Sequence, residues 1–287
     1  MRPGVRTRAP AKINVCLFVG GVRPSDGRHT VVSVMQAVDL CDELTLTAAD
    51  RDVVRCDGVT GPNLAGAARD AFRAHTGHEA PVAITITKAI PVAAGMAGGS
   101  ADAGAVLRLL DEHFVTALGD DVLRELATAL GADVPAQVRP GRHLATGAGE
   151  LVRAVDGPSP YGVVVIAHPE PLSTPAVFRE FDRLHLARSD EELGALDARV
   201  RAVAHDLPDT LVVNDLQPAA ISLCPAIGEN LRRMRAAGAD LALVSGSGPT
   251  VLGLTRTVAA AREVARRVGT DAVVTVPLTD AVKVVPA

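Results

Sequence analysis

The stretch that decides the fold is PVAAGMAGGSADAG, residues 91–104, which holds four glycines and five alanines in fourteen positions. Small residues let backbone N–H groups approach an anion closely, and a helix that begins at Ser100 adds the partial positive charge of its N-terminus. The alternative is a tight strand-to-helix turn in which small residues only serve packing. The stretch is not a Walker A loop, because no lysine follows the glycines, and it lacks the G-x-G-x-x-G dinucleotide pattern. The composition of the stretch alone does not distinguish a phosphate-binding loop from a packing turn.

Apolar periodicity divides the chain into strands and helices, and so predicts an α+β fold. Ser100 is a favourable N-cap for a helix that runs to Phe114, and Gly131 is expected at the C′ position of the next helix. A Pro/Gly/Ser segment near residue 155 changes the character of the chain, so we expect two domains, residues 1–155 and 156–287. Strands are expected over 12–22, 31–40, 42–49, 82–91, 163–169, 242–244, 251–254 and 272–278, and helices over 100–114, 120–130, 189–204 and 225–237.

The composition is that of an ordinary globular chain, with 48% hydrophobic residues, 22% charged residues and a net charge of -4 over 287 residues. No basic run is present, so we expect no nucleic-acid partner. The basic start and the apolar run after it suggest a signal peptide, but Lys12 and Asn14 interrupt the run, which predicts a strand and no membrane partner. The four cysteines lack metal-binding spacing, which indicates reduced thiols in a cytoplasmic protein.

Three polar residues interrupt otherwise apolar or turn-like segments. Lys12 and Asn14 are two residues apart on a predicted strand, so their side chains share a face. A lone lysine is usually solvated, although an apolar strand makes that reading less satisfactory. Asp133 lies just past a predicted helix, where aspartate commonly stabilises a turn. By themselves, these residues do not specify a function.

A second glycine-rich segment, SGSGPT at residues 245–250, lies between two predicted strands. It is either a simple hairpin loop or a second glycine-rich wall beside a phosphate site. Leu243 occupies the first glycine position of G-x-S-x-G, so a hydrolase nucleophile elbow is disfavoured. His75 and His78 have no third metal ligand near them in the sequence, and we expect them at the surface.

Taken together and in order, four motifs resemble the GHMP kinases, a family named after galactose, homoserine, mevalonate and phosphomevalonate kinases. The motifs are PAKIN (10–14), IPVAAGMAGGSADA (90–103), LGADVP (130–135) and SGSGPTV (245–251). The loop over 26–46, with the segments 173–178 and 214–220, is similar to the family members that phosphorylate a cytidine diphosphate sugar alcohol in the non-mevalonate isoprenoid pathway. The resemblance covers nearly the whole chain.

The resemblance implies transfer of the γ-phosphoryl group of ATP, with Mg²⁺, to the 2-hydroxyl group of that small-molecule substrate. It implies an N-terminal domain like the second domain of ribosomal protein S5 and a ferredoxin-like C-terminal domain, in a monomer or weak homodimer. Lys12 and Asp133 match the catalytic pair, with Asp133 as general base and Lys12 beside it. The residues that match the ATP loop are Pro91, Val92, Ala93, Ala94, Gly95, Met96, Ala97, Gly98, Gly99, Ser100 and Ala101, with Ser100 also a candidate Mg²⁺ ligand.

The implied acceptor pocket contains Asn14, Thr174, His29 and Phe178, with His29 reading cytosine and Phe178 stacking on it. Arg28 takes the place of an aromatic residue that usually precedes this histidine, and a guanidinium plane can also stack. Ala97 and Ala101 replace a glycine and a serine that are usual in the ATP loop. These two replacements bear on the affinity for ATP and on the geometry of the Mg²⁺ site. The rival hypotheses are a family member with another acceptor, such as homoserine or mevalonate, and a catalytically inactive nucleotide-binding module.

Overall fold

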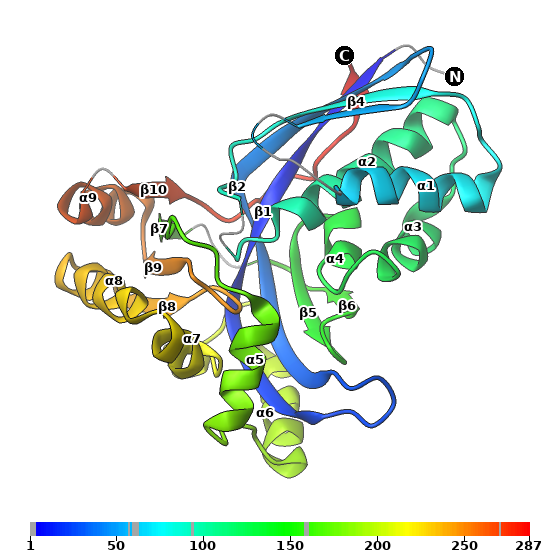
Figure 1. The fold of residues 1–287 in the computed structure, drawn as a ribbon. Helices are drawn as coiled ribbons and strands as arrows, with labels where there is room; N and C mark the ends of the chain where they lie inside the picture. The colour runs from blue at the N-terminus through cyan, green and yellow to red at the C-terminus, as the bar shows by residue number, and fades with distance from the viewer. Residues whose placement is uncertain (1–3, 57, 59–62, 93–94, 158–160, 270) are drawn as a thin grey trace.

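The computed structural model describes residues 4–56, 58, 63–92, 95–157, 161–269 and 271–287. Within these ranges the chain forms two β-sheets, one of seven strands and one of four, with helices packed against each (Figure 1). This arrangement confirms the expected α+β fold. Among the described residues, no helix is both long and apolar enough to cross a bilayer.

A long β-hairpin forms the centre of the first sheet. Its strands are β1 (Val5–Val22) and β2 (His29–Ala48), which pair antiparallel over almost their whole length. The two strands expected over 31–40 and 42–49 are therefore one, and its pairing with β1 continues through two changes of register. The first adds residues to β2 between Ala37 and Cys41, opposite Pro10 and Lys12, and the second adds one to β1 between Asn14 and Cys16. The remaining strands of this sheet are β3 (Val53–Cys56), β4 (Val82–Thr87), β5 (Arg142–Thr146), β6 (Leu151–Ala154) and β11 (Val285–Pro286).

Four helices pack on the first sheet: α1 (Leu64–Thr76), α2 (Gly98–Phe114), α3 (Gly119–Thr128) and α4 (Val134–Val138). Helix α2 contacts β1, β2 and the other three helices, and most of its residues are buried. It is the central helix of this layer, and its N-terminus lies where the glycine-rich stretch ends.

Two expected helix ends are wrong. Helix α2 begins at Gly98, with Ala97 rather than Ser100 at the cap position, because Ala97 adopts a left-handed φ of 55° and its carbonyl already accepts from Ala101 N at 2.8 Å. Helix α3 ends at Thr128, because Leu130 N donates to Ala127 O in a tightened last turn. Gly131 therefore lies in the turn that leads to α4. His75 is exposed as expected, whereas His78 is half-buried and stacks on Phe114 at 4.6 Å.

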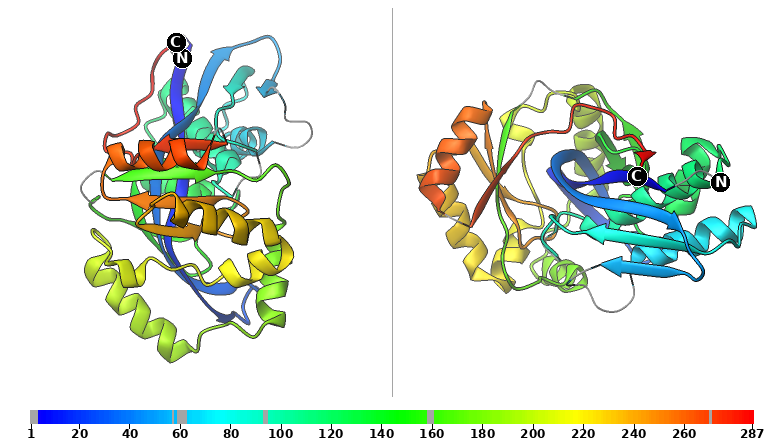
Figure 2. Two further views of the ribbon diagram at one scale, coloured as in Figure 1. Left: turned by 90° about the vertical axis from the view of Figure 1, so that its left-hand side faces the viewer. Right: turned by 90° about the horizontal axis from the view of Figure 1, so that it is seen from above.

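The second sheet has the strand order β10-β7-β9-β8. Its strands are β7 (Gly162–Ile166), β8 (Leu241–Val244), β9 (Val251–Thr255) and β10 (Ala272–Thr275), and α8 (Pro225–Ala236) and α9 (Val258–Val268) cover one face (Figure 2). Side chains alternate along β7: Val163 and Val165 pack in the core of the first sheet, and Val164 and Ile166 pack toward α8 and α9. The βαββαβ order is that of a ferredoxin-like fold.

The segment between β7 and β8 contributes α5 (Thr174–Arg183), α6 (Asp190–Val203), a short 3₁₀ turn (Asp209–Leu211) and α7 (Gln217–Leu223). Helix α6 packs against β1 and β2, and the terminal strand β11 pairs with β1. Elements from the second half of the chain therefore also contact the first sheet. Helix α5 faces the lower part of the long hairpin (Figure 1), which places its side chains beside those of β1 and β2.

Candidate active site

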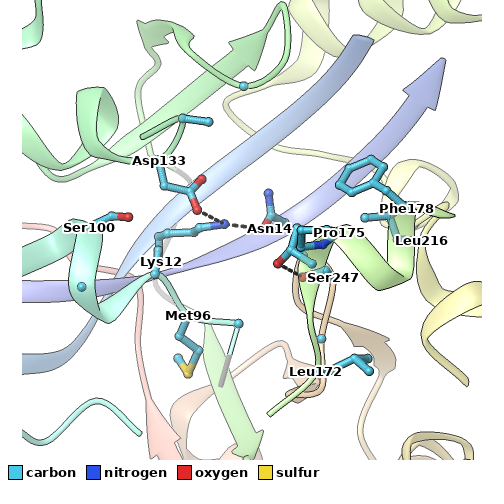
Figure 3. A pocket seen from close by; sticks show the side chains of 18 of the residues that line it. Lys12, Asn14, Met96, Ser100, Asp133, Leu172, Pro175, Phe178, Leu216 and Ser247 are labelled. Carbon is cyan, nitrogen blue, oxygen red and sulfur yellow. Dashed lines mark hydrogen bonds and ion pairs between the residues drawn. The ribbon is translucent and has the colours of Figure 1, made fainter. Parts of the chain in front are cut away.

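A pocket of about 1040 Å³ opens between the two halves of the chain. One end is lined by the glycine-rich stretch and the start of α2, and the other by α5 and the hairpin turn that joins β1 to β2. Its floor includes polar side chains of β1, and its far wall includes residues 246–248 (Figure 3). The pocket thus collects residues from segments as far apart in the sequence as Lys12 and Gly248.

At the centre of the pocket, Lys12 lies between Asp133 and Asn14 (Figure 3). Lys12 Nζ is 3.4 Å from Asp133 Oδ2 and donates to Asn14 Oδ1 at 2.8 Å. Asn14 Nδ2 in turn donates to Ser33 Oγ at 2.8 Å, so the amide is fixed from both sides. Lys12 and Asn14 are buried and share a face of β1, as the alternation predicts, whereas Asp133 is half-buried. This is a cation and a carboxylate held at a fixed separation and open to a ligand.

The position of Asp133 depends on how α4 packs. Asp133 precedes α4, whose first turn contains Pro135, a residue favoured there because it needs no N–H donor. Gly104 of α2 lies directly against the backbone of Gln137, which is possible because glycine has no Cβ. Arg108, also on α2, donates to Gln137 O at 2.5 Å and to Val138 O at 3.3 Å. Helix α2 therefore fixes α4, and with it Asp133.

The glycine-rich stretch lines the other end of the pocket. Pro91, Val92 and Gly95 to Ser100 face it, whereas Ala101 is buried in the core, and Ala93 and Ala94 lie outside the described residues. Met96 O accepts from Lys12 N at 3.1 Å, so the stretch is joined directly to β1. The backbone N–H groups of Gly98 and Gly99, in the first turn of α2, have no partner within the helix. This end can bind an anion.

Residues 245–250 connect β8 to β9 and also form a wall of the pocket, so the two readings of this segment are compatible. Ser245 Oγ donates to Gly95 O at 3.4 Å, and a Cβ on Gly95 would lie only 2.6 Å from Gly248 O. Asn214 Nδ2 donates to Val244 O and Gly246 O, at 2.8 and 2.7 Å. The two glycine-rich segments therefore lie against each other.

The end of the pocket near α5 carries aromatic and basic side chains. The rings of His29 and Phe178 stack with centroids 4.9 Å apart and an interplanar angle of 28°. His29 Nε2 is 2.8 Å from Asp182 Oδ1. Arg28 is exposed and its Nη2 donates to Ala148 O at 3.3 Å, and Thr174 Oγ1 is 2.8 Å from Ser247 Oγ. This end combines a stacking surface with groups that form directed hydrogen bonds.

The sequence reasoning missed several residues that line the pocket. Asp182 follows Thr174 and Phe178 at intervals of four residues on α5, so helical spacing could have identified it. Lys88 precedes the glycine-rich stretch, Asp102 lies near its C-terminal end, and the two form an ion pair at 2.8 Å. Burial raises the pKa of Asp102 to about 6. No local pattern in the sequence indicates this pair.

Metal-binding groups are sparse. Among the described residues, no three His, Cys, Asp or Glu side chains are grouped so that they could hold a metal ion. Ser100, in the first turn of α2, is half-buried and lines the pocket near the glycine-rich stretch. Mg²⁺ usually keeps most of its waters and binds one or two protein groups together with substrate phosphates. The donors present therefore suit a cation that a ligand brings with it.

Models of the GHMP kinase family match both halves of the chain. The N-terminal domain model matches residues 63–141 and the C-terminal model matches residues 191–273. Curated relatives include the 4-diphosphocytidyl-2-C-methyl-D-erythritol kinase of Streptomyces coelicolor, 42% identical over 273 residues, with 91% of each chain covered. The enzyme of the same name from Streptomyces avermitilis is 44% identical over 263 residues, with 88% of each chain covered.

Solved structures give a consistent result. A crystal structure of 4-(cytidine 5'-diphospho)-2C-methyl-D-erythritol kinase superposes with a TM-score of 0.77 and 31% identity, covering 95% of this chain and 99% of that one. The homoserine kinase of Cytophaga hutchinsonii superposes with a TM-score of 0.75 at 18% identity, covering 99% of this chain and 98% of that one. The second match supports the shared fold alone.

Proposed function

This chain belongs to the GHMP kinase family and, within it, to the 4-diphosphocytidyl-2-C-methyl-D-erythritol kinases, and we propose that its central pocket is where ATP phosphorylates the 2-hydroxyl group of that substrate. The single observation that carries the proposal is the position of Lys12 and Asp133, 3.4 Å apart, between an anion-binding end and an aromatic end. The two ends have the chemistry that the two substrates require.

We propose that residues 91–101 hold the triphosphate of ATP. The first turn of α2 offers N–H groups that have no partner within the helix, together with the positive end of its dipole, and both favour a phosphate group. Mg²⁺ would enter with the phosphates, with the Ser100 hydroxyl as its protein ligand, and when bound it would neutralise part of their charge. Ala101 is buried, so it supports the loop by packing and not by contact with the nucleotide.

In the proposed mechanism, Asp133 accepts the proton of the substrate hydroxyl group as that oxygen attacks the γ-phosphorus, and the bond to the β,γ-bridging oxygen breaks so that ADP leaves. The Lys12 ammonium stabilises the negative charge of the transferring group and holds the carboxylate in place. Asn14 fixes Lys12 through the 2.8 Å hydrogen bond and is available to the acceptor. Phosphoryl transfer depends mainly on positioning and charge stabilisation, which these residues supply.

We propose that the cytidine part of the substrate binds at the α5 end of the pocket. Phe178 supplies a stacking surface, His29 supplies ring nitrogens for the base, and Thr174 lines the acceptor region beside Ser247. Arg28 lies at the rim, where its guanidinium plane can cover the base. The division into domains 1–155 and 156–287, a cytoplasmic location and a monomer or weak homodimer are further proposals.

The test measures ADP release with the cytidylyl substrate present and absent, at matched ATP and Mg²⁺ concentrations. We expect ADP release to depend on the cytidylyl substrate and to be absent with homoserine or mevalonate in its place. Turnover with either alternative alcohol would assign a different acceptor. ATP binding without turnover on any acceptor would instead identify a catalytically inactive nucleotide-binding module.

A further inference from the structure

A buried charged cluster lies directly behind the glycine-rich stretch. It consists of Asp42 in the middle of β2, Lys88 just after β4, and Asp102 in α2. Lys88 Nζ donates to Asp102 Oδ2 at 2.8 Å and to Asp42 Oδ2. The Asp42 side chain is fully buried, and those of Asp102 and Lys88 are only 3% and 14% exposed. Groups with so little access to water interact strongly.

The cluster contacts both flanks of the glycine-rich stretch. Asp42 Oδ1 accepts from the backbone N–H groups of Ala89 and Ile90, at 2.6 and 2.8 Å, and these residues lead into the stretch. Asp102 lies near the C-terminal end of the stretch, in the first turns of α2. Lys88 therefore links the segment that enters the stretch to the helix that follows it, and Asp42 holds both against β2.

Lys88 also lies directly beneath the stretch itself. A Cβ on Gly98 would be 3.3 Å from Lys88 Nζ, so the ammonium packs against the first residue of α2. Lys88 and Asp102 line the pocket, whereas Asp42 does not. A ligand in the pocket can contact Lys88 or Asp102 but not Asp42. An effect of Asp42 on ligand binding must therefore act through the residues that it positions.

We propose that Asp42 is a positioning residue for the nucleotide: through Lys88 and the Ala89 and Ile90 amides, it sets the path of the loop that binds the triphosphate. The inference rests on the proposed assignment of residues 91–101 as the ATP loop. Asp42 acts without touching ATP, because its carboxylate is fully enclosed and its hydrogen bonds with Lys88, Ala89 and Ile90 are to residues that lead into the loop.

The test uses Asp42→Asn, because removing Lys88 would leave two buried carboxylates without a counter-ion and could prevent folding. The amide keeps an acceptor for Ala89 and Ile90 but places a donor opposite the Lys88 ammonium. We expect the Kd of a non-hydrolysable ATP analogue and the KM for ATP to rise about 10-fold, the effect of one lost charge-assisted hydrogen bond. The KM for the cytidylyl substrate should change less than about 2-fold.

Asp52→Asn is the matched control. Like Asp42, Asp52 accepts from a backbone N–H, that of Val82 at 3.0 Å, pairs with a cation, Arg73, and does not line the pocket, but these partners lie away from the glycine-rich stretch. The Asp52→Asn substitution should lower the melting temperature and leave the KM for ATP and the KM for the cytidylyl substrate unchanged. The inference is overturned if folded Asp42→Asn binds the analogue as tightly as the wild type, or if both KM values rise equally. A wild-type protein that does not bind the analogue would instead overturn the proposed function.

Discussion

Gly104 of α2 lies against the backbone of Gln137 in α4 so closely that a Cβ on Gly104 would be 2.6 Å from both the carbonyl carbon and the carbonyl oxygen. The same helix carries the end of the glycine-rich stretch at its N-terminus, and α4 is preceded by Asp133. The distance between the proposed phosphate site and the proposed general base therefore depends on a close helix contact that only glycine permits.

Gly104→Ala should displace α4 and thereby move Asp133. We expect kcat to fall about 10-fold or more, since small misplacements of catalytic groups are costly, and the free energy of unfolding to fall by about 1–3 kcal/mol from overpacking. Steady-state kinetics and thermal unfolding provide the measurements.

Gly194→Ala is the control for this substitution. Gly194 is also helical, in α6, but a Cβ there would meet nothing within 4 Å. That variant should be neutral or more stable by up to about 1 kcal/mol, with unchanged kcat. Unchanged kcat in Gly104→Ala as well would show that α4 adjusts without moving Asp133.

Asp133→Asn should abolish most turnover while ATP still binds. A general base typically contributes about 10²–10⁴-fold, and the amide cannot accept the hydroxyl proton. Asp133 is half-buried, and its Oδ2 is 3.4 Å from Lys12 Nζ. The substitution removes this ion pair but leaves the hydrogen bond from Lys12 to Asn14 in place. Calorimetry with an ATP analogue serves as the binding control, and a kcat within a few-fold of wild type would remove Asp133 from the catalytic role.

His143 in β5 should make the protein less stable in acid. Burial, with a smaller contribution from Arg124, lowers the pKa of His143 to about 4. The unfolded chain takes up a proton near pH 6.5 while the folded chain does not, so stabilisation present above pH 6.5 is lost as the pH falls toward 4. Between pH 7.5 and 5 the loss from this residue is about 2 kcal/mol.

His143→Gln provides the comparison, because glutamine does not titrate. Denaturant unfolding of both proteins at pH 7.5 and 5 should show a free energy of unfolding that falls more in the wild type by about 2 kcal/mol. Equal losses in the two proteins would mean that the pKa of His143 is the same in the folded and unfolded chains.

Local patterns in the sequence predict the elements of the fold. The errors occur where contacts between residues far apart in the sequence determine where an element begins or ends. The alternation in 12–22 correctly places Lys12 and Asn14 on one face of β1. Ser100 is the better N-cap by propensity, but α2 begins earlier because Ala97 adopts a left-handed conformation. Two residues before it, the Gly95 carbonyl accepts from Ser245 Oγ of the second glycine-rich segment. Tertiary packing overrides local preference there.

The pocket itself is only partly predictable. The resemblance to GHMP kinases brings together Lys12 and Asp133, which lie 121 positions apart and which no periodicity relates. The pairing of His29 with Asp182 and the cluster of Asp42, Lys88 and Asp102 are not predicted at all. Those contacts join residues on separate elements, and their formation depends on how β2, α2 and α5 pack.

Cytosine is proposed to bind at the α5 end of the pocket, and Phe178 is the residue to test there. Base–aromatic stacking contributes about 1–3 kcal/mol, or roughly 5- to 150-fold in affinity. Phe178→Ala should therefore raise the KM for the cytidylyl substrate within that range. The KM for ATP should be nearly unchanged, because Phe178 lies at the opposite end of the pocket from the glycine-rich stretch (Figure 3). Equal increases in both KM values would indicate a general loss of structure.

Arg28 is expected to cover the free face of the base. One face of the Phe178 ring is already stacked on His29 at 4.9 Å, and Arg28 lines the pocket from the hairpin turn with its guanidinium bonded to Ala148 O. Arg28→Ala should weaken substrate binding, and Arg28→Tyr should keep or improve it, because an aromatic ring stacks on cytosine at least as well as a guanidinium plane. The KM for the cytidylyl substrate measures both effects, with the KM for ATP as the internal control. If Arg28→Ala leaves the substrate KM unchanged, Arg28 is a solvated residue of the turn and the base is held from one side only.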